Sequence, residues 1–302
     1  MMKTLGIDLG GTKILAAVVE EGKILASQRV STPQTGASDV LDAMAEAARV
    51  LLERYPTVKD IGVGSPGPLD LKEGRVIFAP NVANMTNVYM VRDLKTRLGN
   101  EFNIVLENDA NAAGFAEHLY GAAHAWHSSV FITVSTGIGA GLYVGDKIVH
   151  GAHGSAGELG HISVMPRGPL WGDGHGGTLE SMASGRAMER DARYAMNHPE
   201  LTTRDVFALA AQGDSKALKI IDNAAFFMGV GMANMQKIFD PEGFVIGGGV
   251  SLQGDAYLDK VKSYYNELTE NYPRAEIQLA QLGVDAGVIG AASVALYPNR
   301  GL

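Results

Sequence analysis

The amino-acid sequence predicts an α/β protein with two domains. Three observations support this: short apolar runs typical of strands alternate with helix-like segments, polar residues cluster where strands end, and one strand–glycine turn–strand unit occurs twice. The 302 residues, of which 46% are hydrophobic and 19% charged, are enough for two hydrophobic cores. No low-complexity linker separates the halves, so we expect the two domains to share a broad cleft.

The first strand–turn–strand unit begins at residue 4. The apolar run Thr4–Ile7 leads to a turn that starts at Asp8, and a second apolar run returns over residues 14–19. Glycines let backbone N–H groups approach phosphate oxygens, while hydroxyl and ammonium groups add donors and charge. The residues of the turn with these properties are Gly10, Gly11, Thr12 and Lys13. Asp8, at the end of its strand, is placed to reach a magnesium shell.

The second unit repeats this layout in different residues. The run Val130–Val134 leads to a glycine turn over residues 135–141, with Thr136 and Gly137 in it, and a strand follows over residues 142–144. Taken alone, such a glycine segment is typical of a tight hairpin. The pairing favours phosphate binding instead, because two such loops can hold the β- and γ-phosphates of a nucleotide. Neither loop has the sequence pattern of a P-loop or of a dinucleotide-binding turn.

Polar residues also follow two further strands of the first half. After a predicted helix over residues 38–55, the strand Ile61–Gly64 breaks into a rigid turn, Ser65–Asp70. The strand Ile104–Glu107 ends in Asn108-Asp109-Ala110-Asn111, and an alanine-rich helix continues to about residue 121. Ligands of α/β proteins bind at the carboxyl ends of strands, so these ends predict the site.

The second half contains a loop region rich in Gly and His over residues 151–185, followed by helices of which residues 215–239 form the longest. A strand over residues 243–246 leads to three glycines: Gly247, Gly248 and Gly249. These permit close approach by a flat ligand such as adenine, but packing between strand and helix explains them equally well. Helices are also predicted over residues 256–270 and, from small residues suited to close packing, over residues 287–296.

Composition excludes several classes of protein. The net charge of −8 and the absence of a basic run argue against nucleic-acid binding. The chain has no cysteine, which excludes disulfides, thiolate catalysis and metal sites with cysteine ligands. It lacks a signal-like segment and an apolar stretch long enough to cross a bilayer, so we expect a cytoplasmic protein without a membrane partner.

Together, the motifs resemble the ROK family of bacterial sugar kinases and repressors. The matching segments are Asp8 to Lys13, Asn108 to Asn111, Val134 to Gly141, Gly157 to His161, Glu180 and Gly247 to Gly249. The resemblance implies two ribonuclease-H-like domains, as in actin and hexokinase, with ATP and sugar in the cleft between them. It also implies a C-terminal helix that returns to the N-terminal domain. We expect residues 1–116 plus 289–302 in a small domain, residues 117–288 in a larger one, and a homodimer or homotetramer.

The resemblance assigns roles to residues. It places the catalytic base on Asp109; an alternative role, compatible with the first, is N-cap of the following helix. It places sugar contacts on Gly67, Asn81, Asn108, Glu158, His161 and Glu180. Their carboxylate, amide and imidazole groups can pair with the hydroxyls of a pyranose. ATP and phosphate contacts fall on Asp8, Gly10, Gly11, Thr12, Lys13, Thr136, Gly137, Gly247, Gly248 and Gly249.

The sequence departs from the family at a structural zinc site. Many members hold zinc with a histidine and three cysteines, but the cysteine positions here are Trp171, Asp173 and Thr178. We expect no structural zinc, although His161, Asp173 and His175 could form a replacement site. Without zinc, either the Asp173 carboxylate or a backbone carbonyl must orient His161.

These features predict an ATP- and Mg²⁺-dependent kinase that phosphorylates the 6-hydroxyl of a hexose, with glucose favoured and a role in glycolysis. The family also contains kinases for mannose, fructose, N-acetylmannosamine and N-acetylglucosamine. A sugar-responsive transcription regulator is the alternative class, but the first glycine hairpin starts at residue 4 and leaves no room for a preceding DNA-binding helix-turn-helix. An inactive sugar-binding protein is disfavoured because the predicted base and both glycine turns are intact.

Overall fold

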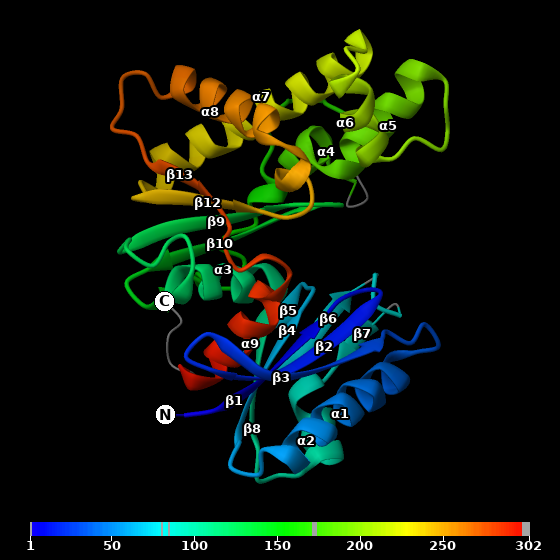
Figure 1. Cartoon of the computed structure of the whole chain (residues 1–302), viewed down its shortest axis with the longest axis vertical. Helices are drawn as coiled ribbons and strands as arrows, with labels where there is room; N and C mark the ends of the chain where they lie inside the picture. Colours follow the sequence, from blue (N-terminus) through cyan, green and yellow to red (C-terminus); the bar gives the residue numbers. More distant parts are fainter. Residues whose placement is uncertain (1, 80, 84, 171–173, 298–302) are drawn as a thin grey trace. The chain divides into compact units, whose positions relative to one another are not determined.

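The computed structural model describes residues 2–79, 81–83, 85–170 and 174–297, which form two compact units (Figure 1). One unit consists of Met1–His127, Gly141–Ala156 and Gln281–Leu302, and the other of Ser128–Ala140 and Gly157–Ala280. The sequence placed the domain boundaries at residues 116 and 288. This division into domains stays a prediction. The internal contacts of the first unit extend to His127 and include residues 141–156.

The first unit is built on a five-stranded sheet with the order β3-β2-β1-β4-β8. Hairpins make β1, β2 and β3 antiparallel, whereas β4 and β8 run parallel to β1 after helical crossovers. The elements of this unit are β1 (Thr4–Leu9), β2 (Lys13–Glu20), β3 (Lys23–Ser31), α1 (Ala37–Arg54), β4 (Asp60–Ser65), β5 (Leu69–Asp70), β6 (Arg75–Ala79), β7 (Met85–Val88), α2 (Met90–Leu98), β8 (Asn103–Asn108), α3 (Asp109–Tyr120), β11 (Lys147–Ile148), η3 (Gly283–Asp285) and α9 (Ala286–Leu296). Strands β5, β6 and β7 form a separate small sheet.

Helices cover both faces of this sheet, with α1 and α2 on one side and α3 and α9 on the other (Figure 1). Side chains alternate along β2, so that Ile14 and Val18 join the core under α1 while Leu15 and Val19 join the core under α9. Because both faces of the sheet are buried, the sequences of β1 and β2 are nearly continuous apolar runs. This burial is why the sequence identified them so readily.

Helix α9 packs on the sheet with its backbone in direct contact. A methyl group added at Gly62 in β4 would overlap the carbonyl oxygen of Ala291, and one added at Gly290 would overlap the carbonyl oxygen of Ala112 in α3. The small side chains of α9 allow this approach. The predicted return of the C-terminal helix to the N-terminal domain is confirmed by its inclusion in the first unit.

A buried carboxylate fixes the entry to α9. Glu117 in α3 is fully buried, and its two oxygens accept hydrogen bonds from the backbone N–H of Ala122 at 2.9 Å and of Leu282 at 2.7 Å. A buried charge is tolerated when such donors satisfy it. Glu117 therefore holds together segments that lie 165 residues apart in the sequence.

The second five-stranded sheet has the order β11-β10-β9-β12-β13. This matches the first sheet strand for strand, with β9, β10, β11, β12 and β13 in the places of β1, β2, β3, β4 and β8, so the repeat seen in the sequence extends to the topology. The remaining elements are β9 (Ser128–Val134), β10 (Ile138–Val144), η1 (Leu159–His161), α4 (Leu179–Ala183), α5 (Gly185–Met196), α6 (Thr203–Ala211), α7 (Ser215–Phe239), β12 (Gly243–Gly247), η2 (Ser251–Gln253), α8 (Asp255–Leu268) and β13 (Glu276–Leu279).

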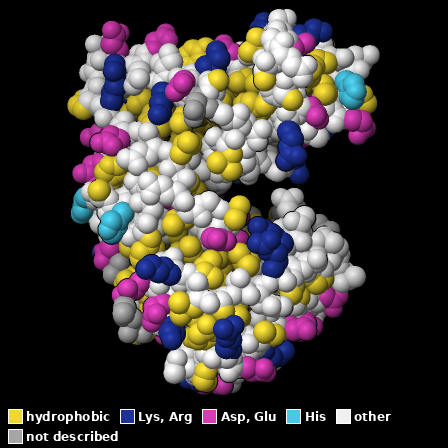
Figure 2. Space-filling model, in the orientation of Figure 1, with side chains coloured by type: hydrophobic (Ala, Val, Ile, Leu, Met, Phe, Trp, Pro, Cys, Tyr) yellow, Lys and Arg dark blue, Asp and Glu magenta, His cyan; other side chains and the backbone are white. Residues whose placement is uncertain are grey.

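The surface drawn in Figure 2 has Lys and Arg side chains scattered among Asp and Glu, as the sequence without a basic run suggested. Among the described residues, no helix combines the length and the apolar character that crossing a membrane requires.

The packing of α9 predicts the effect of two substitutions in β4. Gly62→Ala forces its methyl group into a backbone oxygen, so we expect a loss of at least about 3 kcal/mol in the free energy of unfolding, as for strong overpacking. Gly64→Ala is the matched control, because its methyl group would lie 3.6 Å from Ala112 Cβ, an ordinary contact, and should cost less than about 1 kcal/mol. Urea unfolding of both variants measures the difference; equal stabilities would contradict this view of the packing.

Candidate active site

The first glycine turn joins β1 to β2 and directs its carbonyl oxygens into the protein. Thr32 donates its hydroxyl to Gly10 O at 2.7 Å and its N–H to Thr12 O at 3.1 Å, and Gln34 donates its side-chain amide to Gly11 O at 3.0 Å. An anion meets repulsion from carbonyl oxygens and attraction from N–H groups. With these oxygens engaged, the turn can present its N–H side to a phosphate.

Asp8 is the second-to-last residue of β1, beside this turn. Loss of hydration on burial and, to a smaller extent, the negative charge of Asp109 raise the pKa of Asp8, Lys13 lowers it, and the result is a pKa of about 6. Gly287 in the first turn of α9 lies 3.0 Å from the carboxyl group, measured from where its Cβ would be. The structure thus brings two predicted site carboxylates, Asp8 and Asp109, close enough to repel each other.

Asp109 starts α3 directly after β8. Asn108 is the N-cap of this helix, since its side-chain oxygen accepts from Ala110 N at 2.9 Å and from Asn111 N at 3.2 Å. The alternative role of Asp109 as the N-cap is therefore wrong: the residue before it has the extended backbone that a cap requires. Asp109 itself accepts from Ala110 N at 2.8 Å.

Two predicted sugar contacts lie close to these elements. Gly67 follows β4, and a Cβ at this position would lie 3.7 Å from the side-chain nitrogen of Asn108. Asn81 lies against the first glycine turn, because a Cβ on Gly11 would lie 2.6 Å from Asn81 O. In the first unit the structure therefore gathers Gly67, Asn108 and Asp109 at adjoining strand ends, and Asn81 beside the first glycine turn.

The second glycine turn joins β9 to β10 and has the same carbonyl arrangement. Ser135 O accepts from Gly185 N at 2.8 Å, Thr136 O accepts from Arg186 N at 3.3 Å, and Gly137 O accepts from Ser135 N at 2.9 Å. Two of these donors belong to the first residues of α5. The turn therefore rests on the start of a helix.

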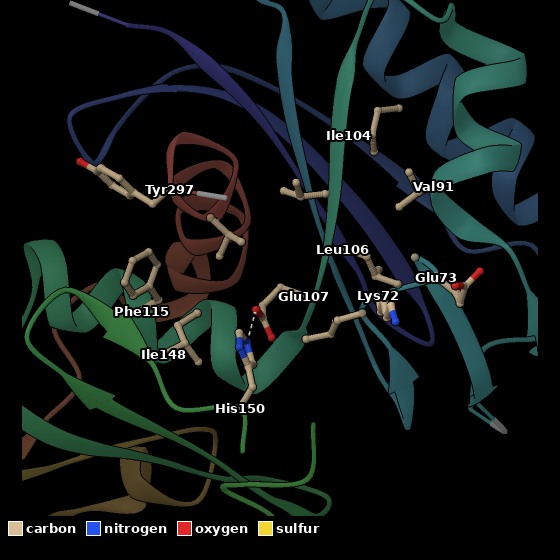
Figure 3. A pocket seen from close by; sticks show the side chains of 14 residues that line it. Lys72, Glu73, Val91, Ile104, Leu106, Glu107, Phe115, Ile148, His150 and Tyr297 are labelled. Atoms are coloured by element: carbon tan, nitrogen blue, oxygen red, sulfur yellow. Dashed lines mark hydrogen bonds and ion pairs between the residues drawn. The ribbon is translucent and has the colours of Figure 1, made fainter. Parts of the chain in front are cut away.

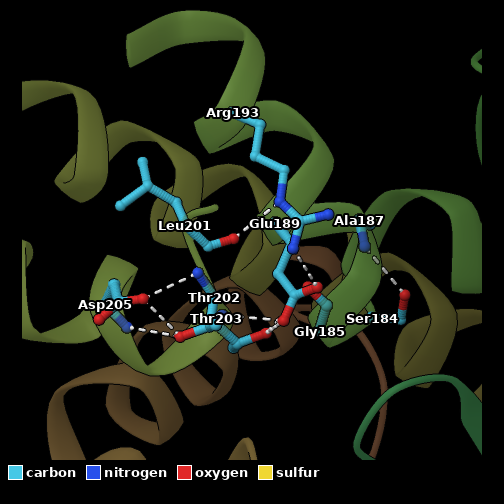
Figure 4. Close-up of polar contacts among 9 residues, drawn as sticks. All are labelled: Ser184, Gly185, Ala187, Glu189, Arg193, Leu201, Thr202, Thr203 and Asp205. Carbon is cyan, nitrogen blue, oxygen red and sulfur yellow. Dashed lines mark hydrogen bonds and ion pairs between the residues drawn. The ribbon is translucent and has the colours of Figure 1, made fainter. Parts of the chain in front are cut away.

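Polar contacts hold this end of α5 in place (Figure 4). Thr203 lies with its hydroxyl 3.0 Å from Gly185 O and donates its N–H to Glu189 at 3.0 Å. Arg193 forms an ion pair with Glu189 at 3.3 Å and donates to Leu201 O at 2.8 Å. The start of α6 thus supports the helix that supports the second glycine turn.

Three predicted sugar contacts in the second unit gather around Ile138, the first residue of β10. Glu180 in α4 accepts from Ile138 N at 2.7 Å and lies against Gly137. Gly160, between Glu158 and His161, lies against Ile138 O. Glu158 and His161 are half exposed, with 3.9 Å between Oε2 and Nε2. The structure therefore joins these side chains to the second glycine turn through backbone contacts.

The three glycines after β12 do not all have the same structural explanation. Gly247 packs on the ring of Phe131, and Gly248 has a positive φ of 88° and lies against Val134 O, so packing accounts for both. A Cβ on Gly249 would meet no atom within 4 Å. The ATP contacts predicted here stay a prediction, and Gly249 is the position that leaves space for a ligand.

This loop repeats the carbonyl arrangement of the glycine turns. Ser251 donates its hydroxyl to Gly248 O at 2.7 Å, and Gln253 donates its side-chain amide to Gly249 O at 3.0 Å. Sequence reasoning missed these donors, and it missed Thr32 and Gln34 as well, because none of them lies in a motif. The register of β3 against β2 sets Thr32 opposite the first turn, and the sequence does not show that register.

The region of the replaced zinc cysteines is described only in part. Thr178 is the N-cap of α4, accepting from Ser181 N at 3.2 Å, whereas Trp171 and Asp173 lie outside the described residues. Among the residues that the structure describes, no three His, Asp or Glu side chains are arranged to hold a metal ion. The absence of structural zinc and the orienting role of Asp173 stay predictions.

Comparisons with known proteins agree with this architecture. The model of the ROK family matches residues 4–297. The crystal structure of a ROK hexokinase from Thermus thermophilus has 40% sequence identity and a TM-score of 0.92, over 98% of this chain and 99% of that chain. A ROK family glucokinase from Streptomyces griseus, in complex with glucose and AMPPNP, has 36% identity and a TM-score of 0.83, over 97% and 99%.

Curated relatives cover two activities. A glucokinase of Streptomyces coelicolor is 36% identical, over 98% of each chain. An N-acetylmannosamine kinase of Pasteurella multocida is 32% identical, over 96% of this chain and 95% of the relative. The two-domain α/β fold predicted from the sequence, of the hexokinase type, is confirmed. The chain belongs to the ROK family.

Proposed function

We propose that this protein is an ATP-dependent hexose kinase that phosphorylates the 6-hydroxyl of glucose. The observation that carries the proposal is the pair of glycine turns. In each turn, three successive carbonyl oxygens accept hydrogen bonds from other groups of the protein, and the first turn lies beside Asp8 and Asp109. Phosphoryl transfer depends mainly on positioning and on stabilising charge, and these turns supply both.

In the first unit, Asp109 accepts the proton of the sugar 6-hydroxyl as that oxygen bonds to the γ-phosphorus of ATP, the bond from this phosphorus to the bridging oxygen breaks, and ADP leaves. Its backbone position at the start of α3 is fixed by the Asn108 cap, and its carboxylate accepts a hydrogen bond from Ala110 N, so the side chain is positioned before substrate binds. Gly67, Asn81 and Asn108 orient the sugar, and Gly10 to Lys13 bind phosphate. Asp8 would hold Mg²⁺ through its water shell, where the ion neutralises charge on the phosphates.

In the second unit, Glu158, His161 and Glu180 bind sugar hydroxyls, Thr136 and Gly137 bind phosphate, and the loop at Gly249 admits the adenine. The link from Glu180 to Ile138 N supports this assignment because it fixes a sugar carboxylate directly to the phosphate turn. We also propose that the enzyme acts in the cytoplasm, as a homodimer or homotetramer.

Glucose is our preferred substrate because the relatives named glucokinase are among the most similar, at 36% identity. The N-acetylmannosamine kinase at 32% identity supports a second candidate. An N-acetyl group at C2 needs additional room and a partner for its amide, so one binding pocket rarely serves both sugars equally well.

A kinase assay that couples ADP release to a colour change tests the proposal. The purified protein, with ATP and Mg²⁺, is compared on glucose, mannose, fructose, N-acetylmannosamine and N-acetylglucosamine. We expect kcat/KM to be at least about tenfold higher for glucose than for the N-acetylated sugars. A preference for N-acetylmannosamine would establish the second candidate, and no phosphorylation of any of the five would overturn the kinase proposal.

Asp109→Asn tests the catalytic base. The amide keeps the shape of the side chain but cannot accept the proton, so kcat should fall by roughly 10² to 10⁴, the usual effect of a general base. Binding of glucose, measured by calorimetry, should remain within about threefold of wild type, since the change removes basicity alone. Retention of more than about a tenth of the wild-type kcat would remove Asp109 from the base role.

Asp8→Asn should stabilise the free protein while it impairs the reaction. Because the pKa of Asp8 in the folded state, about 6, lies above the ordinary value of 3.8, its ionisation weakens the fold as pH rises through this range. The variant should gain about 2 to 3 kcal/mol in unfolding free energy at about pH 7.5, lose that gain near pH 4, and have a lower kcat. Unfolding at both pH values measures the effect, and an equal change at the two values would show that burial of this charge is not the cause.

A further inference from the structure

A cavity of about 450 Å³ lies along the outer edge of β8 in the first unit (Figure 3). Its walls are mostly apolar and include Val91 of α2, Phe115 of α3 and Ile148 of β11. Residues 104–107 of β8 line the cavity, and β8 is the last strand in the order of its sheet. The cavity therefore gives access to the strand that ends immediately before the candidate base.

Two polar groups of this cavity face each other. Glu107 at the end of β8 is only 2% exposed, and its Oε2 lies 2.7 Å from Nε2 of His150, which follows β11 (Figure 3). Burial alone would lower the pKa of His150, but the hydrogen bond and the charge of Glu107 outweigh it and raise the pKa. Lys72 and Glu73, both exposed, are the other charged residues of the lining.

Glu107 connects this pair to the start of α3. Its other oxygen, Oε1, accepts from Asn108 N at 2.9 Å and from the side-chain amide of Asn111 at 3.0 Å. These two residues flank Asp109 in the sequence, one as the cap of α3 and the other in its first turn. Rotation of the Glu107 carboxylate would break both bonds at once, so the frame around Asp109 depends on what holds Oε2.

We propose that His150 is a positioning residue for Asp109, acting through Glu107. A buried carboxylate oxygen without a donor carries a desolvation cost and turns toward water. The cavity provides that water on one side. His150 holds Oε2 against this rotation, so it keeps the first turn of α3 in the geometry that proton acceptance requires. This inference rests on the proposed kinase function, and it assigns a role to a residue outside the sugar and phosphate contacts.

His150→Ala tests the inference because the cavity next to the lost ring can admit free imidazole. We expect kcat to fall about 10- to 100-fold, as for misplacement of a catalytic group, while the KM values for sugar and ATP change less than about twofold. Added imidazole should restore kcat in a saturable manner. His153→Ala, which removes an exposed histidine of the same loop, is the matched control and should behave as wild type with or without imidazole.

Amide hydrogen exchange gives a readout that does not depend on activity. The N–H groups of Ala110 and Asn111 are bonded to the Asn108 cap, so they should exchange faster in His150→Ala and recover with imidazole. Should His150→Ala fail to fold, His150→Gln takes its place, since its amide can donate to Glu107 and should retain both protection and most of kcat. Unchanged kcat and unchanged exchange in the folded alanine variant would overturn the inference. Wild type without kinase activity would instead overturn the proposed function, and the exchange data would still decide the role of His150.

Discussion

The contact on which the first unit depends is that between α9 and the backbone of β1, β4 and α3. Gly62 and Gly290 leave no room for a methyl group, so helix and sheet meet at the distance of backbone atoms. Dispersion forces are strongest at such distances, and few alternative packings satisfy them. Because Asp8 lies near the end of β1 and α3 starts at Asp109, the same contact fixes the two carboxylates of the candidate site relative to each other.

That arrangement has a cost in stability. Burial makes Asp8 costly to ionise, and the negative charge of Asp109 adds to that cost. Under the proposed function, Mg²⁺ would neutralise this charge when it binds with the nucleotide, so the free protein holds an unfavourable charge in a rigid frame. The frame includes the fully buried Glu117, which holds the entry to α9, and the Glu107–His150 pair, which holds the start of α3. Preorganisation of this kind is what transition-state stabilisation requires.

The sequence predicted those elements whose residues carry a strong local signal. The long helix α7 coincides with the predicted residues 215–239, and the helix predicted over residues 38–55 is α1, from Ala37 to Arg54. The small sheet of β5, β6 and β7 was missed because its strands are only two to five residues long and show no periodicity. The sequence did not predict α4, α5 and α6 as separate helices, because their N-cap residues, such as Thr178 and Thr202, occur in a stretch that is already rich in turn residues.

Register was a second limit. The hairpin of β2 and β3 pairs Glu20 with Lys23, and an unbulged ladder counted from there would pair Lys13 with Val30. A bulge opposite Val18 and Val19 shifts the ladder by one residue, so Lys13 pairs with Ser31 and Thr32 falls beside the first glycine turn. No residue type announces this bulge. The donor that engages Gly10 O and Thr12 O was therefore beyond prediction from the sequence, although the turn itself was not.

The glycine turns also show why a structural feature can be repeated while the sequence that forms it is repeated only in part. A turn that is to bind an anion through its N–H groups must satisfy its carbonyl oxygens elsewhere, since both kinds of group are present on every residue. The first turn uses the side chains of Thr32 and Gln34, the second uses backbone N–H groups at the start of α5, and the loop after β12 uses Ser251 and Gln253. Carbonyl oxygens are engaged in all three places, but the donors differ in type and in distance along the chain. Glycines recur in all three places, although at different spacings, and they are the part of the repeat that the sequence shows.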